Sequence, residues 1–355
     1  MPTENRTDCL VLSESELRQL VPKFLLYAIQ GFIIAILNLI TFAAIWRFEL
    51  LWRTEKGYVI LSVLAMSDAL NGIACCLAGV IRNWMIYNGT ANNLRTSLGC
   101  LFTPWNVIWL VMEHTYGATL AMISADRLLM LSFPAHYMGW QVQYAIVLII
   151  VFHLPFLTMT LIPLTELILS SNLRADKPSL CYTDWVYPNV SYYHFVYSQS
   201  ALMACLSVLL YTAVALKYRQ RQKSKVSPGP ADSTSKQRIR KQNRLTVTMG
   251  LSCVFTMIFY ILPLVVKQIL MWADRSNQMA SLVVPYVYLI QNCNAMCNFW
   301  LYVIRHKDIK VAVKCLLNCK HFNPNAAASQ IPKSLNTQKI SSRFRAGSIQ
   351  TAHHE

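Results

Sequence analysis

Long apolar runs separated by polar segments dominate the sequence. Seven of these runs are nearly free of charged residues and cover 22–46, 58–81, 103–125, 142–165, 192–216, 245–271 and 282–304. About 20 predominantly apolar residues suffice for an α-helix to cross the ~30 Å hydrocarbon core of a bilayer, and every run is longer than that. The pattern predicts an all-α fold, a seven-transmembrane helix bundle.

The segments outside the runs complete the predicted organisation. The first run is too long for the apolar region of a signal peptide, so we expect residues 1–21 to be a retained extracellular N-terminal leader. Residues 22–304 then form the membrane domain. In residues 305–320, basic residues are interleaved with aliphatic ones at a spacing typical of a short amphipathic cytoplasmic helix. Residues 321–355 predict a disordered cytoplasmic tail.

Composition narrows the possible functions. Only 14% of the residues are charged and 55% are hydrophobic, whereas soluble domains carry about 25% charged residues. A soluble enzyme is therefore excluded. A membrane enzyme would need metal ligands or an activated nucleophile, but the sequence has no His-Glu-x-x-His, and Gly250-Leu-Ser-Cys-Val254 lacks the second glycine of a nucleophile elbow. We expect neither enzymatic activity nor a metal centre.

The placement of charge predicts the orientation in the membrane. The net charge of +16 could indicate a nucleic-acid partner, but 23 Lys and Arg lie on one side of the runs and eight on the other, with Lys23 at the edge of the first run counted among the eight. Because basic residues accumulate on the cytoplasmic side, we expect a multi-pass plasma-membrane protein with its N-terminus outside, contacting lipid and not nucleic acid. The three N-glycosylation acceptors, Asn5, Asn88 and Asn189, all fall on the predicted extracellular side.

Cysteines divide between the two predicted compartments. Cys9, Cys100 and Cys181 lie on or near the oxidising side, where disulfides form. We expect a Cys100–Cys181 disulfide, with pairing of Cys9 to either residue as the alternative. Cys315 and Cys319 lie in the predicted cytoplasmic helix, where palmitoylation can anchor it.

Polar residues inside the runs are costly and therefore informative. Asp68 lies in the second run, with Asn38 in the first and Asn294 and Asn298 in the seventh. A carboxylate among amides could hold a monovalent cation or anchor a water network. It could equally make purely structural hydrogen bonds between helices, and the sequence leaves both readings open.

A set of short motifs resembles the rhodopsin-like G-protein-coupled receptors across residues 22–320. Matching positions are Asn38, Asp68, Asp126-Arg127-Leu128 for the family's Asp-Arg-Tyr, Asn298 and Tyr302 for the ends of its Asn-Pro-x-x-Tyr, and Cys100 with Cys181 for its disulfide. The stretch Ala125–Leu128, followed by Ser132-Phe-Pro-Ala-His-Tyr137, is most similar to the nematode serpentine chemoreceptors.

The resemblance implies a mechanism. Asp126 would restrain Arg127 until the sixth helix, kinked at Pro263, swings outward and opens a cleft for a heterotrimeric G protein. Tyr211 and Tyr302 would stabilise the open form. Asp68 would provide the family's sodium site.

Departures from the family pattern bear on this switch. Phe299 replaces the seventh-helix proline, and Leu128 replaces the tyrosine of the third-helix motif. The acid often found at the base of the sixth helix is missing, because Lys236–Arg244 contains no Asp or Glu. We therefore expect a weakly restrained resting state with basal signalling. Cys100 and Arg127 are also two residues further apart than usual, which predicts an irregular top of the third helix.

Residues of three runs predict a ligand pocket in the outer half of the bundle. Glu113 lies 14 residues before Arg127, about 21 Å along a helix. The predicted pocket comprises Trp109, Met112, Glu113, Tyr260, Lys267, Tyr288 and Gln291. Glu113 and Lys267 could pair or contact a polar ligand. Alternatively, Glu113 could bond His114 or His153, and Lys267 could reach water.

Competing classes of membrane protein make different demands on the sequence. A retinal photoreceptor needs a lysine in the seventh run, and 282–304 contains none. We expect a chemosensory receptor for an extracellular small molecule. The long loops 82–99 and 166–190 would also suit a peptide, which makes a neuropeptide receptor the first alternative. A transporter lined by Asp68, Glu113 and Lys267 is the second.

Overall fold

The described part of the chain is mostly helical. The computed structural model describes residues 12–54, 56–169, 175, 177–183, 190–224, 250–251, 254–273 and 278–318. The elements within these ranges are α1 (Glu14–Arg47), α2 (Glu49–Thr54), α3 (Lys56–Tyr87), β1 (Leu94–Arg95), α4 (Ser97–Leu101), α5 (Pro104–Ser132), α6 (Pro134–Gly139), α7 (Val142–Leu169), β2 (Lys177–Pro178), α9 (Val190–Ser224), the π-helical turn η1 (Met257–Ile261), α11 (Leu262–Ala273), α12 (Gln278–Arg305) and α13 (Lys307–Leu317).

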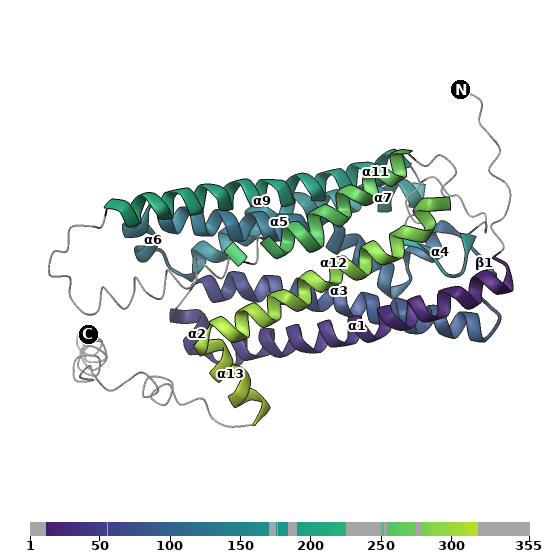
Figure 1. Cartoon of the computed structure of the whole chain (residues 1–355), viewed down its shortest axis with the longest axis horizontal. Helices are drawn as coiled ribbons and strands as arrows, with labels where there is room; N and C mark the ends of the chain where they lie inside the picture. Colours follow the sequence, from purple (N-terminus) through teal and green to yellow (C-terminus); the bar gives the residue numbers. More distant parts are fainter. Residues whose placement is uncertain are drawn as a thin grey trace, which may run out of the picture.

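The long helices lie side by side along the longest axis of the molecule (Figure 1). Packing is closest between α1 and α3, and between α5 and its neighbours α3, α7 and α9. The short helices α2, α6 and α13 lie at one end of the bundle, and α4 and β1 at the other (Figure 1). β1 pairs antiparallel with β2 and joins two loops there. Segments predicted to share a side of the membrane therefore share an end of the bundle.

The first helix begins earlier than its apolar run. α1 starts at Glu14, inside the segment 1–21 that was predicted as a leader. The Ser13 hydroxyl accepts from the Glu16 amide while the Glu16 carboxylate accepts from the Ser13 amide, which is a capping box. These hydrogen bonds from Ser13 hold the pKa of the exposed Glu16 carboxyl below its usual range. A cap made of polar residues thus sets the start of the helix.

A break precedes α5 at the start of the third run, on the side predicted to be extracellular, as the long Cys100–Arg127 spacing predicts. The short helix α4 ends at Leu101, and α5 begins with Pro104 in its first turn. Proline suits this position because its missing N–H would have no helical partner there. The Thr103 hydroxyl and the Asn106 side-chain amide both donate to the Cys100 carbonyl between the two helices.

Three glycines allow α1 and α3 to approach closely. Gly31 of α1 faces Gly72 of α3, and Gly79 of α3 lies against the backbone of α1. A Cβ atom at Gly72 would lie 2.6 Å from the Ala35 backbone nitrogen and 2.8 Å from the Gly31 carbonyl oxygen. Small residues let helices pack at this distance where no hydrophobic effect drives association.

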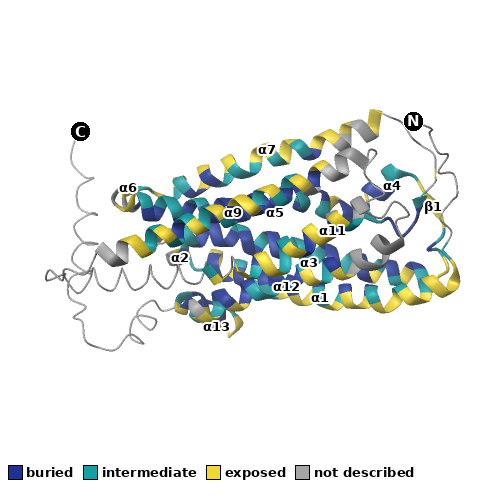
Figure 2. Cartoon of the chain, turned by 45° about the horizontal axis from the view of Figure 1, so that its top comes forward, coloured by how far each residue is buried: buried dark blue, intermediate teal, exposed yellow. Residues whose placement is uncertain are grey.

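The outer surface of the bundle is apolar and identifies a membrane protein. Exposed aliphatic side chains cover the outside of the bundle, while buried residues lie between the helices (Figure 2). Four described helices are long and apolar enough to cross a membrane: α1, α3, Val142–Ile162 of α7 and Ser198–Gln220 of α9. The α7 segment is the most apolar of these and only 11% buried. Such a continuous apolar surface needs a lipid or protein partner.

The close contact of α1 with α3 predicts the effect of a single methyl group. Gly72→Ala should lower the free energy of unfolding by about 1–3 kcal/mol, because the added Cβ meets backbone atoms that cannot move aside. Thermal unfolding in detergent would measure the change. Gly139→Ala is the control, since a Cβ there meets nothing within 4 Å. Equal stability of the two variants would contradict the packing described here.

Candidate functional site

A buried ion pair lies at the end of the bundle that carries α2, α6 and α13. Asp126 and Arg127 come from the last turns of α5 and have side chains that are 0% and 3% exposed. The Arg127 Nε atom lies 3.3 Å from Asp126 Oδ2, and an Nη atom points to the Met130 sulfur at 3.7 Å. Burying two charges is costly unless both are held by partners.

Tyr137 of α6 is a partner that the motif comparison did not assign. Its hydroxyl donates to Asp126 Oδ1 at 3.0 Å. Burial, and then the Asp126 carboxylate, raise the pKa of Tyr137 well above its usual range, so the hydroxyl stays protonated as a donor. Lys56 donates to the Tyr137 carbonyl and lies 4.6 Å from the centre of its ring. The short α6 thereby ties the ion pair to the start of α3.

Gly57 leaves the space that the Arg127 guanidinium occupies. A Cβ atom at Gly57 would lie 2.6 Å from an Arg127 Nη atom. The guanidinium is the far end of a flexible side chain, so it could move away with little change to the backbone. Arg127 therefore rests against α3 because residue 57 has no side chain.

The remaining predicted switch residues lie in the same half of the bundle or in the sixth segment, which is the name used here for residues 250–251 and 254–273. Tyr211 of α9 faces that segment, because a Cβ atom at Gly250 would lie 2.9 Å from its hydroxyl. Tyr302 of α12 is 1% exposed within the core cluster that includes Tyr58 and Leu61. Pro263 follows the π-helical turn η1, in which the Leu262 amide donates to the Met257 carbonyl. Proline and π-helical turns both bend helices, and the π-helical turn was not predicted.

The predicted polar network forms only in part. The Asn298 amide donates to Asp68 Oδ2 at 3.4 Å, and the Tyr116 hydroxyl also interacts with the Asp68 carboxyl group. Within the described residues, Asp68 Oδ1 has no partner at hydrogen-bond geometry. Asn294 donates to the Tyr116 hydroxyl and accepts from Thr256. The side-chain nitrogen of Asn38 donates to the Ile34 carbonyl of its own helix and not to Asp68, Asn294 or Asn298. A buried carboxylate oxygen without a partner fits a hard monovalent cation or a water molecule.

A cavity with a volume of about 70 Å³ lies between α3, α5, α9, α11 and α12. Six of the seven predicted pocket residues line it: Trp109, Met112, Glu113, Tyr260, Tyr288 and Gln291. Asn71, Tyr116, Ser200 and Asn292 add polar atoms to its wall. Among these, the Asn71 amide donates to Asn292, and the Ser200 and Tyr260 hydroxyls share a hydrogen bond of 2.8 Å. This volume holds a few water molecules or a very small ligand.

Lys267 is the exception among the predicted pocket residues. It is 1% exposed and lies outside the cavity lining that the described residues form. Its ammonium group donates to the Tyr288 hydroxyl at 2.9 Å and lies 4.6 Å from the ring centre. Its ammonium group therefore contacts Tyr288 in the cavity wall, while Lys267 itself is not among the described residues that line the cavity. His153, an alternative partner for Glu113, instead hydrogen bonds to Thr119 and to the Ile149 carbonyl.

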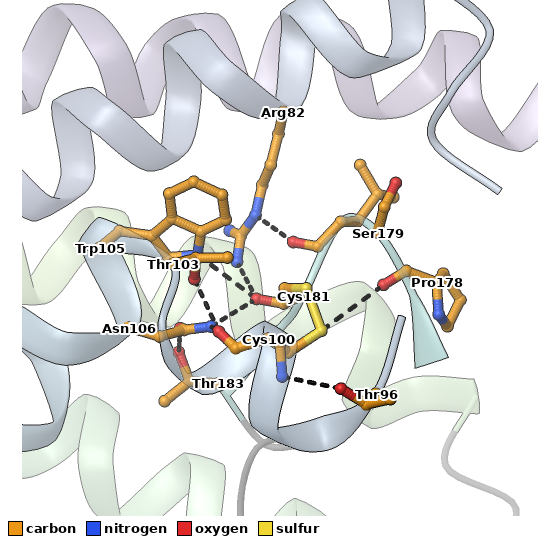
Figure 3. Close-up of a disulfide and its surroundings, with 12 residues drawn as sticks. Arg82, Thr96, Cys100, Thr103, Trp105, Asn106, Pro178, Ser179, Cys181 and Thr183 are labelled. Carbon is orange, nitrogen blue, oxygen red and sulfur yellow. Dashed lines mark hydrogen bonds between the residues drawn. A yellow bond between two sulfur atoms is a disulfide. The ribbon is translucent and has the colours of Figure 1, made fainter. Parts of the chain in front are cut away.

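The opposite end of the bundle is organised around a disulfide. Cys100 and Cys181 are joined, with their Cα atoms 5.0 Å apart, and both are fully buried. Arg82 reaches the same place from α3 and donates to the Leu180 and Cys181 carbonyls (Figure 3). Arg82 is 2% exposed, although it lies just beyond the second apolar run. Sequence periodicity does not indicate such a contact between a side chain of α3 and the backbone of a distant loop.

Other predicted sites have been placed only in part. Asn88 is exposed in the turn after α3, beside Gly89, whose φ of 65° suits a tight turn. Cys315 is half-buried in α13. The lysines of α13 are exposed, and Ile309, Ala312 and Val313 pack against the bundle, so that face is not all available to lipid. Asn5, Cys9, Asn189, Cys319 and Lys236–Arg244 lie outside the described residues.

Comparison with known proteins adds no assignment. No protein-family model matches the chain, and no curated protein matches it at a significant level. The geometry of the two ends and of the cavity must therefore carry any functional proposal.

Proposed function

We propose that the protein is a seven-transmembrane receptor of the rhodopsin-like class that activates a heterotrimeric G protein. The observation that carries the proposal is the buried Asp126–Arg127 pair with Tyr137 and Gly57 around it. The described helices overlap all seven apolar runs, which supports seven spans. A buried guanidinium held by a few breakable contacts at the end of a bundle is suited to a two-state switch.

The proposed topology follows the separation of loops between the two ends. The end with the disulfide and Asn88 is extracellular, where oxidation and glycosylation occur. The end with Arg127 and α13 faces the cytoplasm, next to the inner leaflet of the plasma membrane. There the exposed lysines of α13 attract anionic lipid at about 1 kcal/mol each, and Cys315 is positioned for palmitoylation.

The proposed switch moves the sixth segment. The bend at η1 and Pro263 lets the part before it swing away from α5 and α9. Arg127 would then leave its place beside Gly57 and line the cleft that receives the G protein. Tyr211 and Tyr302 face the same region and would support the open form.

The cavity favours a small ligand over a peptide. Its wall combines aromatic rings, side-chain amides and the Glu113 carboxylate, and its volume of about 70 Å³ is far below that of a drug-sized site. We therefore propose a small extracellular molecule with polar groups, as a chemosensory receptor would bind. A peptide could engage only the outer loops without a larger opening.

Asp68 is the proposed site of a sodium ion. Its unpartnered Oδ1 atom, with Asn298 beside Oδ2, offers oxygen ligands of the kind that hard cations prefer. The ion would neutralise the buried carboxylate and hold α3 against α12.

Nucleotide exchange by G proteins tests the proposed function. Membranes containing wild type should accelerate exchange with a pooled small-molecule ligand, and Arg127→Ala should abolish this at matched surface expression. Arg95→Ala is the control, since Arg95 is exposed at the other end. Exchange that is equal in wild type and Arg127→Ala would contradict the proposal. Silence in both, combined with substrate uptake, would favour a transporter.

Gly57→Ala should raise exchange without ligand. The added Cβ displaces the Arg127 guanidinium from its resting place, so the resting state loses stability. We expect roughly a two- to tenfold increase, equivalent to ~0.4–1.4 kcal/mol, measured in the same membranes. Gly139→Ala should leave exchange unchanged. A Gly57→Ala variant that folds and signals like wild type would show that Arg127 is not restrained there.

Sodium should stabilise the wild type through Asp68. Replacing choline chloride by sodium chloride at equal ionic strength should raise the Tm in a saturable way, because a ligand of the folded state stabilises by mass action. Asp68→Asn keeps the shape and should lose this response. Identical sodium responses in the two proteins would exclude the proposed site.

A further inference from the structure

Arg82 is a buried cation that the proposed switch does not use. It lies five residues before the end of α3 and donates from Nε to the Leu180 carbonyl at 2.8 Å and from an Nη atom to the Cys181 carbonyl at 2.9 Å. Both acceptors belong to the segment 177–183, here called the disulfide loop. A single side chain of a membrane helix thus holds two consecutive backbone groups of this loop (Figure 3).

Aromatic rings from three parts of the chain surround the guanidinium. Its central carbon lies 5.4 Å from the ring centre of Phe24 in α1, 5.5 and 5.8 Å from those of Trp105 and Trp109 in α5, and 4.8 Å from that of Tyr182 in the disulfide loop. A flat, weakly hydrated cation is attracted to such rings. The cage therefore joins α1, α3, α5 and the loop through one charge.

The Cys181 carbonyl oxygen accepts hydrogen bonds from several side chains. Besides Arg82, it accepts from the Asn106 amide at 3.1 Å and from the Trp105 indole at 3.4 Å. Cys181 has a φ of 44°, a conformation that is uncommon for a residue with a side chain. Unfavourable backbone conformations persist where the surroundings hold them, and here three donors converge on one oxygen.

Trp109 connects this cage to the cavity. It contacts Arg82 and also lines the cavity, where its indole donates to Asn71 at 3.2 Å. Its ring stacks on Tyr288 of α12 with ring centres 6.4 Å apart. Tyr288 in turn accepts from Lys267 of α11. A continuous set of contacts therefore runs from the loop to the two helices on the far side of the cavity.

We propose that Arg82 is a positioning residue that fixes the disulfide loop on the bundle and orients Trp109 in the cavity wall. Movement of the loop and rearrangement of the cavity are coupled through this one side chain. A ligand that displaces Trp109 loosens the loop, and a loop pulled outward releases Trp109. The inference rests on the contacts around Arg82 and does not depend on coupling to a G protein.

Lysine cannot substitute for arginine in this role. An ammonium group is a compact point charge, whereas the guanidinium fork donates in two directions while its flat face lies against rings. Arg82→Lys should lose one carbonyl contact and much of the ring contact. Losing a hydrogen bond from a charged donor should open the loop roughly ten- to a hundredfold more often.

Hydrogen exchange and fluorine NMR on the full-length protein in nanodiscs test this inference. The amides of 177–183 should exchange at least about tenfold faster in Arg82→Lys than in wild type. With 5-fluorotryptophan incorporated, the Trp109 resonance, assigned with Trp109→Phe, should shift or broaden. Arg95→Lys is the matched control, because Arg95 is exposed in β1 and pairs with the same loop through Lys177.

Two results would overturn the inference. Loop exchange in Arg82→Lys equal to that in Arg95→Lys would show that Arg82 does not hold the loop. Faster loop exchange with an unchanged Trp109 resonance would remove the coupling to the cavity. Should Arg82→Lys fail to fold, Tyr182→Leu removes only the nearest ring and should produce the same two changes to a smaller extent.

Discussion

Hydrocarbon offers no partner to a polar group, so every buried donor, acceptor and charge must be satisfied within the protein. This constraint explains the helices, which satisfy their own backbones, and the glycines that let α1 and α3 pack without a hydrophobic drive. It also explains why Arg82 and Arg127, the two most buried arginines among the described residues, are surrounded by specific partners. Each is 2% exposed, and they lie at opposite ends of the bundle.

The two arginines are held in different ways. Arg82 lies between backbone carbonyls and aromatic rings contributed by three segments, and moving it would disturb all of them at once. Arg127 lies beside its neighbour Asp126, against a gap left by Gly57, with Tyr137 sharing the carboxylate. Fewer contacts restrain Arg127, and its side chain is long enough to turn away. This difference supports the proposal that the end with Arg127 rearranges while the end with Arg82 stays in place.

Sequence reasoning worked where a side chain's environment follows from periodicity. The apolar runs predicted helices, and the lining of the cavity by Trp109 and Glu113 follows from their positions on one helix. It could not give the contacts that Arg82 and Lys267 make, because spacing places a Cα atom and not the end of a flexible side chain. The role of Gly57 also depends on a neighbour 70 positions away. The start of α1 at Glu14 follows from the polar Ser13–Glu16 cap. Hydropathy does not detect this cap and places the start of the first run at residue 22.

The central claim is that the sixth segment moves away from α5 when Arg127 is released. Phe133 is exposed at the C-terminal end of α5, and Leu251 is exposed in the sixth segment. Spin labels at these two positions would measure the distance between α5 and the sixth segment by double electron–electron resonance in nanodiscs. Adding nucleotide-free G protein should shift the distance distribution to longer values in wild type and leave it unchanged in Arg127→Ala. A wild-type distribution that does not respond, with both labels incorporated and the protein folded, would contradict the account.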